Sequence, residues 1–258
     1  MNHKAKITEQ LSNEFFNHSF RKSSFLYYGL VPVTCNLALE RQLWEDREEV
    51  EANRLFSKDD PEYYLPQLAI TLSNLGGSYS ELGKMKEAVA VTQEAVEIGR
   101  KLVRNYPPQF QKMLAGLLDN LGNRLYEAGQ RKAALRYTTE AVALFRKIAK
   151  DDKPFYRDLS QSLARVGLLL CEAGQKDKAL EVAREAVSIS RGLVYGNLDN
   201  NLACRLKCLN SLVLVYQQLG KSQEAQLIIQ EAEVFNDNWN SWITRRQRNE
   251  TVGNADNN

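Results

Sequence analysis

Residues 72–95, LSNLGGSYSELGKMKEAVAVTQEA, decide the fold. Leu72, Leu75 and Tyr79 recur at the three- and four-residue intervals of one helix face. Gly83 interrupts this pattern, and a second apolar stripe begins at Ala88. Because glycine adopts the left-handed backbone of a tight helix end without steric cost, the stretch predicts two helices joined by a short turn.

The same pattern occurs four times along the chain. Three markers define it: a turn glycine, an alanine five residues later, and a Glu-Ala pair, and each marker recurs at intervals of 46, 45 and 46 residues. They are Gly83, Gly129, Gly174 and Gly220; Ala88, Ala134, Ala179 and Ala225; and Glu94-Ala95, Glu140-Ala141, Glu185-Ala186 and Glu231-Ala232. No alternating β pattern interrupts them. The chain is therefore expected to be an all-α array of four helix-turn-helix units.

The period divides the chain into seven parts. We expect a flexible N-terminal segment, a capping helix that is a degenerate half-repeat, four repeats and a C-terminal tail. In chain order these are residues 1–33, 34–60, 61–106, 107–152, 153–197, 198–236 and 237–258. Prolines stand near the starts of the first three repeats, and Asp60-Pro61 has the form of an N-cap followed by proline at the first helical position.

Both ends of a repeat array need a cap, because a terminal unit would otherwise expose its apolar face. The 34–60 segment is predicted to be an amphipathic helix that contains Leu37, Leu43, Trp44, Val50 and Leu55. The acidic run Glu45-Asp46-Arg47-Glu48-Glu49 is predicted to form its solvent side. At the other end, Trp239 and Trp242 are expected to fold onto the last hairpin.

The small residues of each unit predict close helix packing. Gly76, Gly122 and Gly167 lie in the first helices, and the recurring alanines lie in the second. A larger side chain at these positions would push the two helix axes apart, at a cost of about 1–3 kcal/mol. We therefore expect them at the helix crossings.

Composition excludes several functional classes. The 258 residues carry 34 Lys and Arg against 32 Asp and Glu, a net charge of +2, which disfavours a dedicated nucleic-acid binder. Both histidines, His3 and His18, are near the N-terminus, so the repeats contain no imidazole for a proton relay or a metal. Gly220-Lys221-Ser222 lacks the earlier glycine and the strand that a phosphate-binding loop requires. We expect a non-enzymatic protein without catalytic residues, metal or cofactor.

Cysteine usage bears on the compartment. The four cysteines contain no C-x-x-C pair, and Cys204 and Cys208 are spaced by one helical turn. Reduced thiols packed as small apolar groups explain this pattern best. We therefore expect a cytoplasmic, intracellular protein. The two long uncharged runs are too polar for a bilayer, so no membrane association is expected.

The repeated residues resemble the tetratricopeptide repeat. The first unit shows the family pattern in Leu72, Leu75, Gly76, Tyr79, Gly83, Ala88 and Ala95, and the other units follow in register. The resemblance runs from about Glu62 to Phe235, with a longer period that is similar to kinesin light chain and to fungal and bacterial signalling proteins. It implies a right-handed α-solenoid whose first helices line a concave groove.

The resemblance also implies a peptide-binding site in that groove. Transferred by register, its residues are Ser73, Gly77, Glu81, Asp119, Asn123, Tyr126, Glu127, Gln161, Leu168, Glu172, Lys207, Asn210 and Gln217. The acidic members favour a basic segment of a protein partner. Three alternatives stay open: an ordinary polar surface, a self-associating scaffold, and a detached sensor or regulatory region of a larger signalling protein. Neither the partner nor the oligomeric state follows from the sequence.

Overall fold

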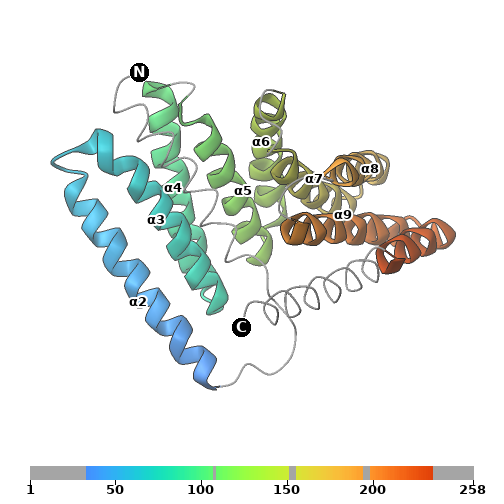
Figure 1. Cartoon of the computed structure of the whole chain (residues 1–258), viewed down its shortest axis with the longest axis horizontal. Helices are drawn as coiled ribbons and strands as arrows, with labels where there is room; N and C mark the ends of the chain where they lie inside the picture. Colours follow the sequence, from blue (N-terminus) through green and yellow to red (C-terminus); the bar gives the residue numbers. More distant parts are fainter. Residues whose placement is uncertain (1–32, 107–108, 151–154, 194–197, 235–258) are drawn as a thin grey trace, which may run out of the picture. The chain divides into compact units, whose positions relative to one another are not determined.

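The computed structural model describes residues 33–106, 109–150, 155–193 and 198–234. These residues form helices joined by short turns, and no strand occurs among them (Figure 1). The predicted all-α class is confirmed. The tail at 237–258, with Trp239 and Trp242, and the N-terminal segment up to residue 32 lie outside the described residues. The chain divides into two compact units, Met1–Phe155 and Tyr156–Asn258.

The first unit is a stack of consecutive helices. In chain order these are α2 (Val33–Phe56), α3 (Pro61–Glu81), α4 (Met85–Asn105), α5 (Gln111–Glu127) and α6 (Arg131–Ala149). Each helix packs against the next one along the chain, and α3 also contacts α5 (Figure 1). This is the packing of an all-α repeat solenoid, in which helix hairpins stack on one another.

The second unit repeats this architecture. It contains α7 (Tyr156–Glu172), α8 (Lys176–Gly192), α9 (Leu198–Gln218) and a further helix over residues 222–234. Helix α9 packs against both α7 and α8. The first helix of one hairpin thus lies beside both helices of the preceding hairpin.

Local sequence signals set the helix ends. The Asp60 side chain accepts a hydrogen bond from the Tyr63 backbone amide at 3.2 Å, and Pro61 opens α3. Each hairpin turn contains one glycine with positive φ, between 70° and 75°, at the four predicted positions. At the first turn, the amide of Lys84 donates to the carbonyl of Tyr79 at 2.9 Å, which satisfies a carbonyl at the end of α3.

Glycines sit where the two helices of a hairpin cross, as predicted. A Cβ atom on Gly76 would lie 2.2 Å from Thr92 Oγ1, and one on Gly122 would lie 2.2 Å from Thr138 Oγ1. Gly167 is less tight, with the Ala183 Cβ at 3.3 Å. A side chain larger than hydrogen fits at Gly76 or Gly122 only if Thr92 or Thr138 rotates or the neighbouring helix shifts.

Ion pairs link the second helices of successive hairpins. Arg54 on α2 bonds Glu94 on α4 at 2.8 and 2.9 Å, and Arg100 on α4 bonds Glu140 on α6 at 2.6 Å. Both pairs join residues 40 positions apart. The repeat pattern of the sequence does not indicate which residue each arginine pairs with. The shared spacing places α2 in the same register as α4 and α6.

Helix α2 differs from the predicted amphipathic cap. Leu43 and Val50 are buried as expected, but Leu37, Trp44 and Leu55 are exposed. Asp46, predicted to face solvent, is buried: its carboxylate accepts hydrogen bonds from Ser78 and from Gln42. The interpretation failed because both sides of this helix carry apolar residues and a polar residue occupies its buried side.

Candidate peptide-binding surfaces

In the first unit, α3 and α5 form one candidate surface. These are the first helices of two successive hairpins. Ser73 Oγ accepts a hydrogen bond from the Asn120 amide at 3.0 Å, and Ser80 Oγ donates to Glu127 Oε2 at 2.6 Å. Both contacts join residues 47 positions apart, so the two helices lie side by side in register.

Glu127 is the centre of a hydrogen-bonded cluster on this surface. Its carboxylate accepts from Ser80, from the Asn123 amide at 2.7 Å and from Arg124 Nη1 at 2.7 Å. The side chains of Arg124 and Glu127 are 17% and 29% exposed. Each donor therefore has a fixed orientation while the cluster stays open to solvent. We call Ser80, Asn123, Arg124 and Glu127 the Glu127 cluster.

The structure rearranges the predicted set in this unit. Ser73 is only 5% exposed and is engaged with Asn120, so it joins the two helices and does not line a free surface. Gly77, Asp119 and Asn123 are half-buried, and Glu81 is exposed. Tyr126 is half-buried, and the Arg131 guanidinium lies 4.0 Å from its ring centroid. Within this set, a hydrogen bond links Asn123 directly to Glu127.

Arg124 is the member of the Glu127 cluster that the sequence pattern did not predict. It follows Asn123 directly, and a Cβ on Gly77 would lie 3.9 Å from its Nη2 atom, so it extends from α5 toward α3. The available signal was its i,i+3 spacing to Glu127, a distance at which opposite charges meet on a helix surface. Its positive charge partly neutralises a carboxylate that was counted as a site for a basic partner.

In the second unit, α7 and α9 form the corresponding surface. Lys207, Asn210, Gln217 and Glu172 are exposed, and Gln161 and Leu168 are half-buried. These residues come from the two first helices of this unit, as the register predicted.

Buried polar contacts hold α7 against α9. Ser211 Oγ donates to the Ala164 carbonyl at 2.7 Å, and Cys208 Sγ lies 3.5 Å from the Ser160 carbonyl. Cys204 Sγ is 3.2 Å from Ser160 Oγ. Contact with Cys204 and burial raise the pKa of the Cys208 thiol. These thiols are packing groups at a helix contact, as the sequence predicted.

An ion-paired carboxylate links the last two hairpins. Glu231 accepts from Arg191 Nε at 3.0 Å and from Arg205 Nη2 at 3.1 Å. The Arg191 hydrogen bond, outweighing the opposing effect of burial, holds the pKa of Glu231 below its ordinary value. Between α8 and α9, Arg184 donates to the Tyr216 hydroxyl at 3.0 and 3.1 Å. These contacts stabilise the hairpin stack and present no open site.

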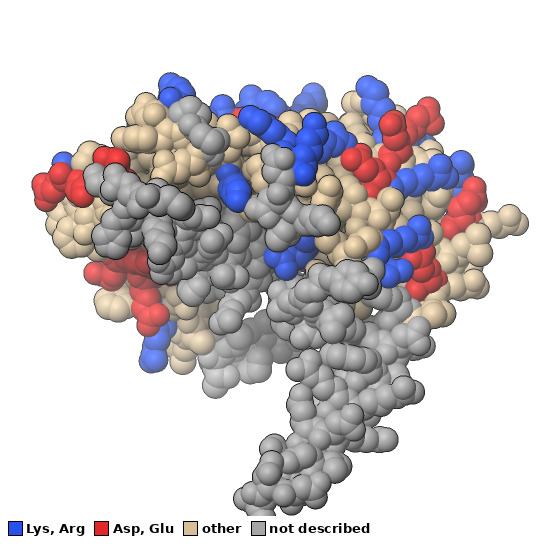
Figure 2. All heavy atoms as spheres, turned by 45° about the horizontal axis from the view of Figure 1, so that its top comes forward, with Lys and Arg blue, Asp and Glu red and all other residues tan. Residues whose placement is uncertain are grey.

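The described part of the chain offers neither a metal site nor a membrane-spanning helix. It holds no group of three or more His, Cys, Asp or Glu side chains placed to bind a metal ion. None of its helices combines the length and apolar content needed to cross a bilayer. On the face drawn in Figure 2, side chains of both charge signs are interspersed.

Comparisons with known proteins agree with this architecture. The tetratricopeptide repeat model matches residues 68–103 and 114–154, which cover the hairpins of α3–α4 and α5–α6. A search of curated proteins found no match.

Solved structures share the fold at low sequence identity. The nearly identical TPR-like repeats of a putative kinesin light chain from Podosopora anserina align with a TM-score of 0.61 and 17% identity, covering 93% of this chain and 99% of that one. A second structure of these repeats gives 0.55 and 20%, covering 77% and 92%. Aspartyl phosphate phosphatase F from Bacillus subtilis gives 0.51 and 13%, covering 92% of this chain and 61% of that one.

These likenesses concern the fold alone. The repeat pattern, the glycine turns, the hairpin stack and the family match agree with one another. Tetratricopeptide repeats are therefore recognised at residues 68–103 and 114–154, and the described helices share the all-α solenoid fold of the aligned structures.

Proposed function

We propose that this chain is a non-enzymatic interaction module that binds a peptide segment of a partner protein on its first helices. Protein–protein interaction is typical of tetratricopeptide repeats. The observation that carries the proposal is the Glu127 cluster, in which α3 and α5 hold an amide, a guanidinium and a carboxylate in fixed positions at the surface.

The chemistry of the cluster suits an extended peptide. The carboxamide of Asn123 offers donors and an acceptor, so it can bond both the N–H and the C=O of a peptide backbone. Arg124 adds donors for a peptide carbonyl or carboxylate. Because the side chains are already ordered by hydrogen bonds to Glu127, binding would cost less side-chain entropy than at a mobile surface.

The preference for a basic segment now rests on fewer groups. Arg124 already pairs with Glu127, which reduces the negative charge available to a ligand. The other acids of the predicted set are Glu81 and Asp119 in the first unit and Glu172 in the second. The preference for a basic peptide segment therefore stays a prediction in both units.

Peptides selected from a random display library on the full chain would test the proposal. The variant Asp119→Ala/Asn123→Ala should lower the affinity for the selected peptides by at least about tenfold. Its helicity, measured by circular dichroism, should be unchanged. The matched control is Glu97→Ala/Gln93→Ala, which removes the same two groups at the same spacing from the exposed side of α4. Peptides that bind the first variant as well as the original chain would refute the proposal.

A further inference from the structure

Helix α2 carries an apolar stripe on the side that faces away from its neighbours. Leu37, Trp44 and Leu55 are 66%, 63% and 59% exposed. Their intervals of seven and eleven residues are close to two and three turns, so the three side chains share one side of the helix. The buried residues Leu43 and Val50 lie on the opposite side. Arg41, Glu48 and Glu51 lie within about 40° of the same side, so charged side chains stand between the three apolar ones.

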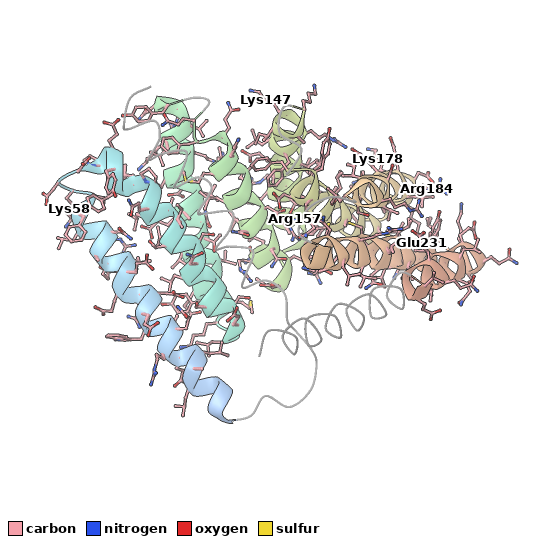
Figure 3. The ribbon with its side chains drawn as sticks, in the orientation of Figure 1. Lys58, Lys147, Arg157, Lys178, Arg184 and Glu231 are labelled. Atoms are coloured by element: carbon pink, nitrogen blue, oxygen red, sulfur yellow. The ribbon has the colours of Figure 1, made fainter. Side chains whose placement is uncertain are left out.

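The repeat itself shows that packing does not require this stripe. The ion pairs place α2 in register with α4 and α6, at offsets of 46 and 92 residues. The residues equivalent to Trp44 are then Ala90 on α4 and Arg136 on α6. The residues equivalent to Leu55 are Lys101 on α4 and Lys147 on α6. All four of these residues are exposed, and Lys147 points away from α6 (Figure 3). At these equivalent positions, the described helices α4 and α6 carry small or charged side chains where α2 carries Trp44 and Leu55.

Acidic side chains flank the stripe. The exposed acids of α2 are Glu40, Glu45, Glu48, Glu49 and Glu51, against the arginines Arg41, Arg47 and Arg54, and Arg54 pairs with Glu51 at 2.9 Å. A shallow hollow of ≈ 300 Å³ lies at one end of the stripe, lined by Leu37, Ala38, Arg41, Gln42 and Glu45. The surface thus combines an apolar line, a recess for a side chain and a negative border.

We propose that this side of α2 docks a basic amphipathic helix from a partner protein. The stripe extends over 19 residues, with a rise of about 27 Å from Leu37 to Leu55, which matches a partner helix of about five turns. Leucine-like side chains of the partner would cover Leu37, Trp44 and Leu55, and its Lys or Arg residues would meet the glutamates on both sides. A second copy of this chain fits less well, because its own glutamates would face those of the first copy.

A pair of designed peptides tests the chemistry directly. The probe is a fluorescein-labelled 18-residue helix of Leu and Lys, with Leu at helical spacing, and its counterpart carries Glu in place of every Lys. Fluorescence anisotropy with the full chain should show micromolar binding of the Lys peptide and none of the Glu peptide. Trp44→Arg should weaken the Lys peptide by at least about tenfold. Folding should be unaffected, since α6 carries arginine at the same position.

Ala90→Arg is the matched control. It adds the same charge at the equivalent position of α4, so it should change the affinity by less than about twofold if Trp44 is a specific anchor. Equal weakening by both variants would indicate simple charge attraction and would overturn the proposal. Equal binding of the Lys and Glu peptides, or no binding of either, would overturn it as well.

Trp44 fluorescence distinguishes the other possible occupants. With Trp239 and Trp242 replaced by Phe, Trp44 is the single tryptophan. We expect acrylamide to quench it readily in the free chain and poorly with the Lys peptide bound. Poor quenching of Trp44 in the free chain would mean that another part of the chain, or a second copy, covers it. A second copy is indicated if sedimentation shows a dimer that Trp44→Arg dissociates. Either outcome would overturn the partner-helix proposal without affecting the proposed surface on α3 and α5.

Discussion

The adjacent glycines Gly76 and Gly77 offer a direct test of the hairpin packing. Both lie in α3, and replacing either one by alanine adds one methyl group. A Cβ at position 76 would lie 2.2 Å from Thr92 Oγ1 and 3.2 Å from the Ala88 carbonyl oxygen. At position 77 the only atom within 4 Å is Arg124 Nη2, at 3.9 Å.

The two substitutions should have opposite effects on stability. Replacing glycine by alanine inside a helix gains about 1 kcal/mol when space is available, which is the expectation for Gly77→Ala. At Gly76, Thr92 would have to rotate away from the bond that it donates to the Ala88 carbonyl at 2.7 Å. Thr92 is fully buried, so the lost bond and the overpacking should cost about 1–3 kcal/mol. We therefore expect Gly76→Ala to be less stable than Gly77→Ala by about 2–4 kcal/mol.

Urea unfolding followed by circular dichroism measures this difference. At about 2–4 °C per kcal/mol, the melting temperatures should also separate by several degrees. A Gly76→Ala variant as stable as Gly77→Ala would refute the close approach of α3 and α4.

Three further predictions concern other parts of the chain. Gly174→Ala should lower stability by about 1–2 kcal/mol in thermal melts, because φ is +75° there and no neighbouring atom compensates. The pKa of Glu231 is lowered in the folded chain, so the pair with Arg191 stabilises the fold above the unfolded pKa and is lost as the pH falls through the folded value; Arg191→Gln should reduce the pH dependence of urea stability between about pH 5 and 3, and an unchanged profile would contradict this. Cys204 and Cys208, both 0% exposed, should react with iodoacetamide only as the chain unfolds, and rapid labelling of the native chain would contradict their placement.

Local signals were the most predictable from the sequence. The turn glycines, the Asp60 cap and the glycine crossings depend on interactions within a few residues or within one hairpin, and the structure confirms all of them. Repetition strengthened these predictions, since a single glycine or alanine would have been ambiguous.

Contacts between hairpins were harder to predict. Arg100 and Glu140 were each recognisable as repeated residues, but only the superposition of α4 and α6 brings them together. The predictions that Ser73 lines the groove and that Asp46 faces solvent were wrong for the same reason. Each is polar and looks solvent-exposed along its own helix, and each is buried by a neighbouring helix that offers it a hydrogen bond.

The sequence by itself determined the all-α class, the four-fold repeat and the hairpin turns, because helix periodicity and glycine backbone freedom act over short distances. Only the tertiary structure decided which polar residues remain available for a ligand. Glu127 is an isolated acid in the sequence, but stacking α3 on α5 makes it the centre of a cluster with Ser80, Asn123 and Arg124. Likewise, Trp44 and Leu55 look like core residues of a cap, and the absence of a described helix on that side of α2 leaves them at the surface. Burial depends on neighbours that are distant in sequence, and the helix period alone does not specify them.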